Sequence, residues 1–120
     1  MIKKIYCVLS VDGMHCWQNI PDTDQLNDVQ FLKSLHRHIF NFKCVKVVDH
    51  NDRHVEFIHL KRDVLDFLHE QYYDDDQRSH MFGSRSCEML AEQLISAFDL
   101  SSCEVSEDGE NGSIVEVDCD

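Results

Sequence analysis

Histidine is the residue type whose spacing first suggests chemistry. Eight His occur among the 120 residues, and His36 and His38 are separated by a single residue. Because side chains alternate along a strand, a strand here would direct both imidazoles to the same face. His15 lies at the end of the first expected strand, and if the two strands are neighbours it joins the pair at one end of the sheet. The alternative is an ordinary surface or core pair, because this composition produces such a spacing by chance.

Three imidazoles would leave the fourth position of a tetrahedral metal ion open to water or substrate, as in catalytic zinc sites. Neutral imidazole suits Zn²⁺, and cobalt, nickel and copper are alternatives. Cys16 could ligate in place of His15, although adjacent residues on a strand point to opposite faces. The sequence therefore predicts a metal site formed by His15, His36 and His38, with Zn²⁺ as the expected ion.

The six cysteines contain no Cys-x-x-Cys pair, which excludes a zinc ribbon and a thioredoxin-like motif. The apolar run after Met1 ends before Asp12 without a small-residue cleavage site, so we expect no secretory signal. We therefore expect reduced, mostly buried thiols in a cytoplasmic protein. No stretch approaches the roughly 18 to 20 apolar residues of a membrane span, so we expect no membrane partner.

Composition limits the fold and the partners. With 42% apolar residues, one Pro and four Gly, residues 1–120 are expected to form a single domain. The chain carries 11 basic and 23 acidic residues, a formal charge of −12. Because binding along nucleic acid needs clustered Lys and Arg, we expect no direct nucleic-acid partner.

The patterning predicts strands at 2–11, 36–48, 102–107 and 113–117. A helix carries Leu60, Val64, Phe67 and Leu68 on one face, and a second spans about 86–98. We expect a long polar connection over 12–30, an exposed loop over 73–83, and a hairpin turn over 108–112 that contains Asn-Gly. The order ββααββ predicts an α+β fold, with an antiparallel four-stranded sheet and both helices on one face.

The order of elements and the residues together resemble the 6-pyruvoyl-tetrahydropterin synthase and 6-carboxy-tetrahydropterin synthase family, of the tunnelling fold. In that family a His ends the first strand and a Leu-His-Gly-His-Asn-Tyr/Phe segment opens the second. His15 and residues 35–40 (LHRHIF) take those places here. Residues 56–61 (EFIHLK) resemble the family's entry to its first helix, residues 85–88 (RSCE) its Pro-Thr-x-Glu, and Glu107 its last glutamate. The resemblance covers nearly the full length.

This resemblance implies a zinc ion on His15, His36 and His38, and a pterin or nucleotide-derived heterocycle held at Ser86, Glu88 and Glu107. A carboxylate can accept two hydrogen bonds from an amino-pyrimidinone edge. Alternatively, Glu88 only favours the positive end of its helix, and Glu107 is one more acid of a solvated hairpin. The family also implies a homo-oligomer, such as a hexamer, that closes its sheets into a barrel and builds the active site between subunits.

Two family features are missing. The catalytic Cys that precedes the His-x-His pair by four residues is replaced by Leu32, and the family's Asp-His pair between the helices has no counterpart. His69 follows Leu68, and His80 follows Ser79. Because the reaction needs a group that moves protons, the candidates for catalysis are Cys16, His69 and His80.

Two functions from different classes follow. The first is a zinc-dependent protein of the pterin synthase type, a lyase by resemblance, in which the metal polarises a substrate oxygen. The second is a non-catalytic acidic protein that sequesters a small ligand or mimics nucleic acid toward a basic partner. The acid-rich stretches 74–76 and 104–120 motivate the second function, and a solvated surface also explains them.

Overall fold

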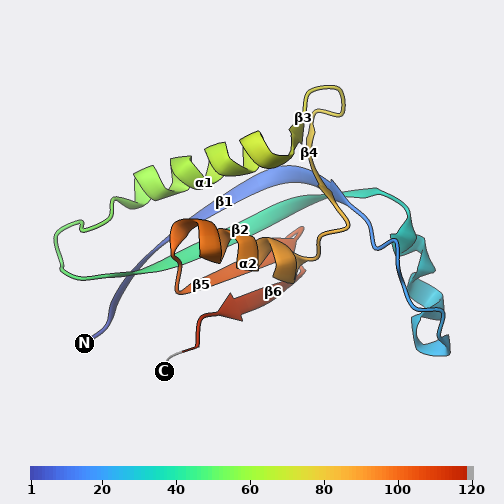
Figure 1. Cartoon of the computed structure of the whole chain (residues 1–120), viewed down its shortest axis with the longest axis horizontal. Helices are drawn as coiled ribbons and strands as arrows, with labels where there is room; N and C mark the ends of the chain where they lie inside the picture. The colour runs from blue at the N-terminus through green and yellow to red at the C-terminus, as the bar shows by residue number, and fades with distance from the viewer. Residues whose placement is uncertain (119–120) are drawn as a thin grey trace.

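A six-stranded mixed sheet with both α-helices packed against it forms the framework of the computed structural model, which describes residues 1–118 (Figure 1). The elements in chain order are β1 (Lys3–His15), the 3₁₀ helix η1 (Asp24–Lys33), β2 (His36–Val48), α1 (Phe57–Tyr72), β3 (Tyr73–Asp74), β4 (Ser79–Gly83), α2 (Cys87–Phe98), β5 (Ser102–Glu107) and β6 (Asn111–Glu116). The strand order across the sheet is β3-β4-β1-β2-β5-β6.

The structure confirms the α+β class, and each of the four predicted strands is present. It corrects the four-stranded antiparallel sheet to six strands, because residues 73–83 form a β3–β4 hairpin rather than an exposed loop. Strand β4 pairs parallel to β1, with Gly13 opposite His80. These strands escaped prediction because two and five residues are too short to show a clear period.

Each α-helix begins at a capping side chain and buries one apolar stripe. The side chain of Glu56 accepts a hydrogen bond from the Ile58 N–H at the start of α1, and Ser86 accepts one from the Met89 N–H at the start of α2. Each helix buries one stripe at helical spacing: Leu60, Val64, Leu68 and Tyr72 on α1, and Cys87, Leu90, Ala91 and Leu94 on α2.

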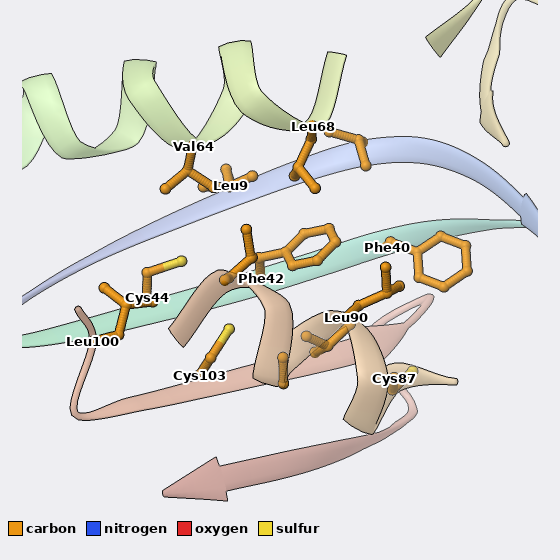
Figure 2. Close-up of a cluster of buried hydrophobic side chains, with 14 of the residues drawn as sticks. Leu9, Phe40, Phe42, Cys44, Val64, Leu68, Cys87, Leu90, Leu100 and Cys103 are labelled. Atoms are coloured by element: carbon orange, nitrogen blue, oxygen red, sulfur yellow. The ribbon is translucent and has the colours of Figure 1, made fainter. Parts of the chain in front are cut away.

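One core joins both helices to one face of the sheet. Phe42 lies opposite Leu9 on one side and Val105 on the other, so β1, β2 and β5 present their apolar side chains together. Figure 2 shows Val64 and Leu68 of α1 and Leu90 of α2 gathered with the strand side chains Leu9, Phe40 and Phe42 over this face. Both helices therefore cover the same face, as predicted.

The opposite face of the sheet keeps several apolar side chains in contact with solvent. Val8, Lys43, Glu104 and Ile114 form one row across β1, β2, β5 and β6, and Val8 and Ile114 are 49% and 65% exposed. Tyr6, Ile39 and Val47 on the same face are also exposed. We call this surface, defined by Tyr6, Val8, Ile39, Val47 and Ile114, the uncovered face.

Among residues 1–118, the five cysteines are buried and form no disulfide, in agreement with the expected thiols. Cys119 lies outside the described residues. No helix in the described part of the chain combines the length and the apolar character needed to cross a bilayer.

Candidate metal centre and adjoining pocket

The register between β1 and β2 brings three histidines together at one end of the sheet. His15 pairs directly with His36, and Gly13 pairs with His38. All three side chains lie on the helix-covered face, in line with the buried Phe40. The ring centroids are 4.6 Å apart for His15 and His36, 4.9 Å for His36 and His38, and 5.5 Å for His15 and His38. One nitrogen from each ring lies within 4.8 Å of the other two.

Each imidazole is held through its Nδ1 atom by an oxygen acceptor. His15 Nδ1 lies 3.2 Å from the Arg85 carbonyl oxygen, and His36 Nδ1 lies 2.8 Å from that of Ser34. His38 Nδ1 lies 2.7 Å from Asp108 Oδ2. Carbonyls and carboxylates only accept, so these contacts assign the proton to Nδ1 in each ring. The Nε2 lone pair is then free, which is how outer contacts orient metal-binding histidines.

The free nitrogens have an unusual environment. Nε2 of His15 and Nε2 of His38 are both buried without a hydrogen-bond partner. Glu107 places Oε1 at 2.9 Å from the first and Oε2 at 3.5 Å from the second. The short separation is not a hydrogen bond, because with Nδ1 protonated both facing atoms are acceptors. A cation or a proton between them would remove this mismatch, and a divalent metal ion fits the donor set.

The electrostatic surroundings keep His15 in the form that ligates metals. Burial lowers the pKa of His15, the hydrogen bond to Arg85 and the charge of Glu107 oppose this, and the neighbouring imidazoles lower the pKa further. A lowered pKa means that the ring is neutral at physiological pH. Neutral imidazole is the metal-binding form.

Gly13 is required for the packing that supports these rings. A Cβ atom at Gly13 would lie 2.4 Å from Cε2 of Phe82 and 2.7 Å from Cδ2 of Phe40, which is too close for any side chain. The Phe40 ring in turn contacts His15 and His38 edge-on, at centroid distances of 5.0 and 5.9 Å. The lack of a side chain at Gly13 therefore leaves room for the Phe40 ring, which packs against His15 and His38.

A pocket of about 410 Å³ adjoins the three-histidine cluster and contains most of the predicted site residues. His15, His36 and Glu107 line one side. Ser86 and Glu88 line another, at the start of α2. Its volume is within the usual range for sites that bind small organic ligands. The structure thus brings the predicted heterocycle-binding residues and two of the predicted metal ligands into one cavity.

The two glutamates of the pocket differ in the groups that their carboxylates contact. Glu88 accepts a hydrogen bond from the Ser113 hydroxyl, whereas Glu107 faces the unpaired histidine nitrogens. Ser86 uses its hydroxyl oxygen as the α2 cap. Sequence reasoning missed Cys87, whose thiol lies 3.9 Å from Glu107 Oε1. Burial and the nearby carboxylates of Glu107 and Glu88 raise the pKa of Cys87 to about 12, so this thiol stays protonated.

Cys16 and Leu32 both line the pocket. Cys16 is buried, and its backbone N–H donates to the Gly83 carbonyl oxygen at 2.9 Å. Leu32 lies in η1, and its carbonyl oxygen accepts a hydrogen bond from the Trp17 backbone N–H at 2.7 Å. Leu32 takes the position of the catalytic thiol in the family that the chain resembles. This position therefore lies at the pocket, and its side chain here is apolar.

His69 and His80, the other predicted catalytic residues, do not line this pocket. They lie with Tyr73 in a separate aromatic cluster, where the His69 and Tyr73 rings stack at 4.4 Å. His80 Nδ1 lies 2.9 Å from the Asp12 carbonyl oxygen. The rings of Phe82 and Phe40 stand between His80 and His15. Within one chain, these two histidines do not join the metal centre.

Three further residues of the centre, Ser34, Arg85 and Asp108, were not predicted. The first two act through backbone carbonyls, for which side-chain types give no signal. Asp108 has a weak signal, since it follows the predicted Glu107 and opens an Asp-Gly turn. Comparison with known proteins adds nothing to this set, because no family model matches the chain and no curated protein matches it significantly.

Proposed function

We propose that this protein binds zinc through Nε2 of His15, His36 and His38, and binds a pterin or nucleotide-derived heterocycle in the adjoining pocket. The observation that carries the proposal is the set of three Nδ1 contacts, which leave Nε2 unprotonated in each ring of a cluster where one nitrogen per ring lies within 4.8 Å of the other two. Three His ligands on a d¹⁰ ion leave a position for water or substrate. The bound ion would act as a Lewis acid on a substrate oxygen.

The pocket's own residues suit a heterocycle with several N–H groups. Glu107 lies at the boundary between the metal centre and the cavity, and Glu88 lies on the α2 side. A carboxylate that accepts two N–H groups gives a directional contact to an amino-pyrimidinone edge. Glu107 would therefore anchor the heterocycle once the metal coordinates the facing histidine nitrogens, as the family resemblance implies.

Catalysis of the synthase type would need a proton-transfer group at this pocket. Cys87 is protonated, Leu32 is inert, and Cys16 is the remaining thiol among the described pocket residues. His69 and His80 could reach a pocket only from a neighbouring copy of the chain. This fits a tunnelling-fold homo-oligomer, a hexamer by resemblance, in which the uncovered face is buried in a barrel.

The second candidate function is a non-catalytic binding protein of the same fold. Two observations favour it: an apolar Leu32 where the resembling enzymes carry the catalytic thiol, and a charge of −12 that would repel an anionic substrate. In this case the metal and the pocket would hold a ligand without converting it, or the acidic surface would meet a basic partner.

Metal content tests the first part of the proposal. Protein stripped with chelator and then dialysed against zinc should retain about one equivalent per chain, because three anchored imidazoles form a single site. The double variant His36→Ala, His38→Ala should retain none. The matched control His50→Ala, His54→Ala removes a pair of histidines outside the centre and should retain the full amount. Equal zinc in the two variants would show that the centre is not the site.

Ligand binding tests the second part. Trp17, the one Trp of the chain, lines the pocket and serves as a reporter. Neopterin should quench Trp17 fluorescence in the zinc-loaded protein. Glu107→Gln should weaken binding at least tenfold, while Glu110→Gln, at an exposed position of the adjacent turn, should not. Loss of dihydroneopterin triphosphate over time then separates an enzyme from a binding protein. Absence of quenching would refute the heterocycle assignment.

A further inference from the structure

Asp108 makes two directed contacts with β2 at the metal centre. Its Oδ2 atom accepts the Nδ1–H of His38 at 2.7 Å, and its Oδ1 atom accepts the backbone N–H of Ile39 at 2.8 Å. Its own backbone N–H donates to the Ile39 carbonyl oxygen at 2.7 Å. One residue is therefore fixed at three points, and both of its carboxylate oxygens are in use.

The β5–β6 turn holds Asp108 in a conformation suited to this role. Asp108 and Gly109 have φ values of 57° and 71°, and Glu110 N–H closes the turn on the Glu107 carbonyl oxygen at 3.0 Å. This is the φ pattern of a type I′ turn, in which Asp, Asn and Gly are favoured. With the backbone set by the turn, the two hydrogen bonds to His38 and Ile39 hold the carboxylate in place.

Glu107 and Asp108 are adjacent in the chain and lie next to the two different ring nitrogens of His38. Glu107 lies 3.5 Å from Nε2 of His38, and Asp108 lies 2.7 Å from Nδ1. Of the three Nδ1 contacts at the centre, only this one comes from a charged group. A carboxylate behind a metal-binding imidazole fixes its tautomer and increases its basicity toward the metal.

We infer that Asp108 is a positioning residue for metal binding, which acts through His38 and makes the β5–β6 turn part of the metal centre. The inference rests on the proposed zinc site and adds a residue that does not touch the metal. Loss of such an outer carboxylate typically weakens metal binding 10- to 100-fold.

Zinc affinity, measured by competition with a chromophoric chelator, tests this role. Asp108→Gly keeps a residue that accepts the positive φ but removes both acceptors, and should weaken zinc binding 10- to 100-fold. Asp108→Asn also fits the turn but offers one acceptor oxygen instead of two, and should fall between the wild type and Asp108→Gly. Glu110→Gln removes one negative charge from the same turn and should bind zinc as the wild type does, which controls for net charge.

A second measurement does not require metal. Long-range ¹H–¹⁵N correlation spectra of the metal-free protein report which ring nitrogen of His38 carries the proton. The wild type should show the Nδ1–H tautomer, and Asp108→Gly should lose this preference while His36 keeps its own. Unchanged zinc affinity and an unchanged His38 tautomer in Asp108→Gly would overturn the inference and leave the zinc site standing. Absence of zinc binding by the wild type would overturn both.

Discussion

At the residue scale, His80 should make the stability of the metal-free protein depend on pH. Burial lowers the pKa of His80, with His69 acting in the same direction and the Asp12 carbonyl and carboxylate acting against it. Between this lowered value and the ordinary pKa of about 6.5, the unfolded chain binds more protons than the folded chain. The free energy of unfolding therefore falls as the pH drops below about 6.5.

The variant His80→Gln should lose less stability on acidification than the wild type, because Gln can donate to the Asp12 carbonyl but cannot be protonated. Urea unfolding at pH 7.5 and pH 5.5, with chelator present, measures the difference. His59→Gln alters an exposed histidine of α1 and should retain the wild-type pH dependence. Equal losses in the wild type and His80→Gln would show that His80 does not contribute.

The sequence predicts the three histidines of the site but not the residues that contact them from outside. Strand alternation was enough to pair His36 with His38, and apolar segments were enough to bring His15 beside them. The contact between His38 and Asp108 spans 70 residues and depends on a turn that meets the neighbouring strand. No local sequence pattern predicts a contact between residues so far apart, so the Asp108 contact to His38 could not be predicted.

At the scale of elements, β1 supports the centre through Gly13. Gly13→Ala should lower the free energy of unfolding by about 1 to 3 kcal/mol, because the new methyl group overlaps the Phe82 and Phe40 rings. It should also weaken zinc binding, since Phe40 packs against His15 and His38. Urea unfolding and chelator competition measure the two effects. Ser10→Ala, on the exposed side of β1, is the control, and a Gly13→Ala protein as stable as this control would contradict the account.

The elements differ in how well the sequence pattern predicts them. Strand β2 was predicted with its observed bounds, since thirteen residues of alternating and β-branched character give a clear signal. The 3₁₀ helix η1 buries no residue, so it has no apolar stripe from which to predict it. The β5–β6 hairpin was predicted, but it turns at Asp108-Gly109 and places Asn111 and Gly112 in β6.

At the scale of the whole molecule, the uncovered face predicts self-association. Light scattering at micromolar concentration should give a mass several times the 14.1 kDa of one chain. Val8→Glu with Ile114→Glu should reduce that mass, because two charges in one row would oppose burial of the face. Ile58→Glu places a charge at an exposed apolar position of α1 and should leave the oligomer intact. A monomeric wild type would contradict the barrel and any catalytic role for His69 or His80.

X-ray absorption at the zinc edge measures whether three imidazoles hold a zinc ion in this protein. Protein loaded with one equivalent of zinc should show three imidazole nitrogens at about 2.0 to 2.1 Å and light-atom ligands only. The imidazole signal should disappear in the His36→Ala, His38→Ala protein. A sulfur shell at about 2.3 Å would instead show that cysteine holds the metal, and would rule out the three-histidine site.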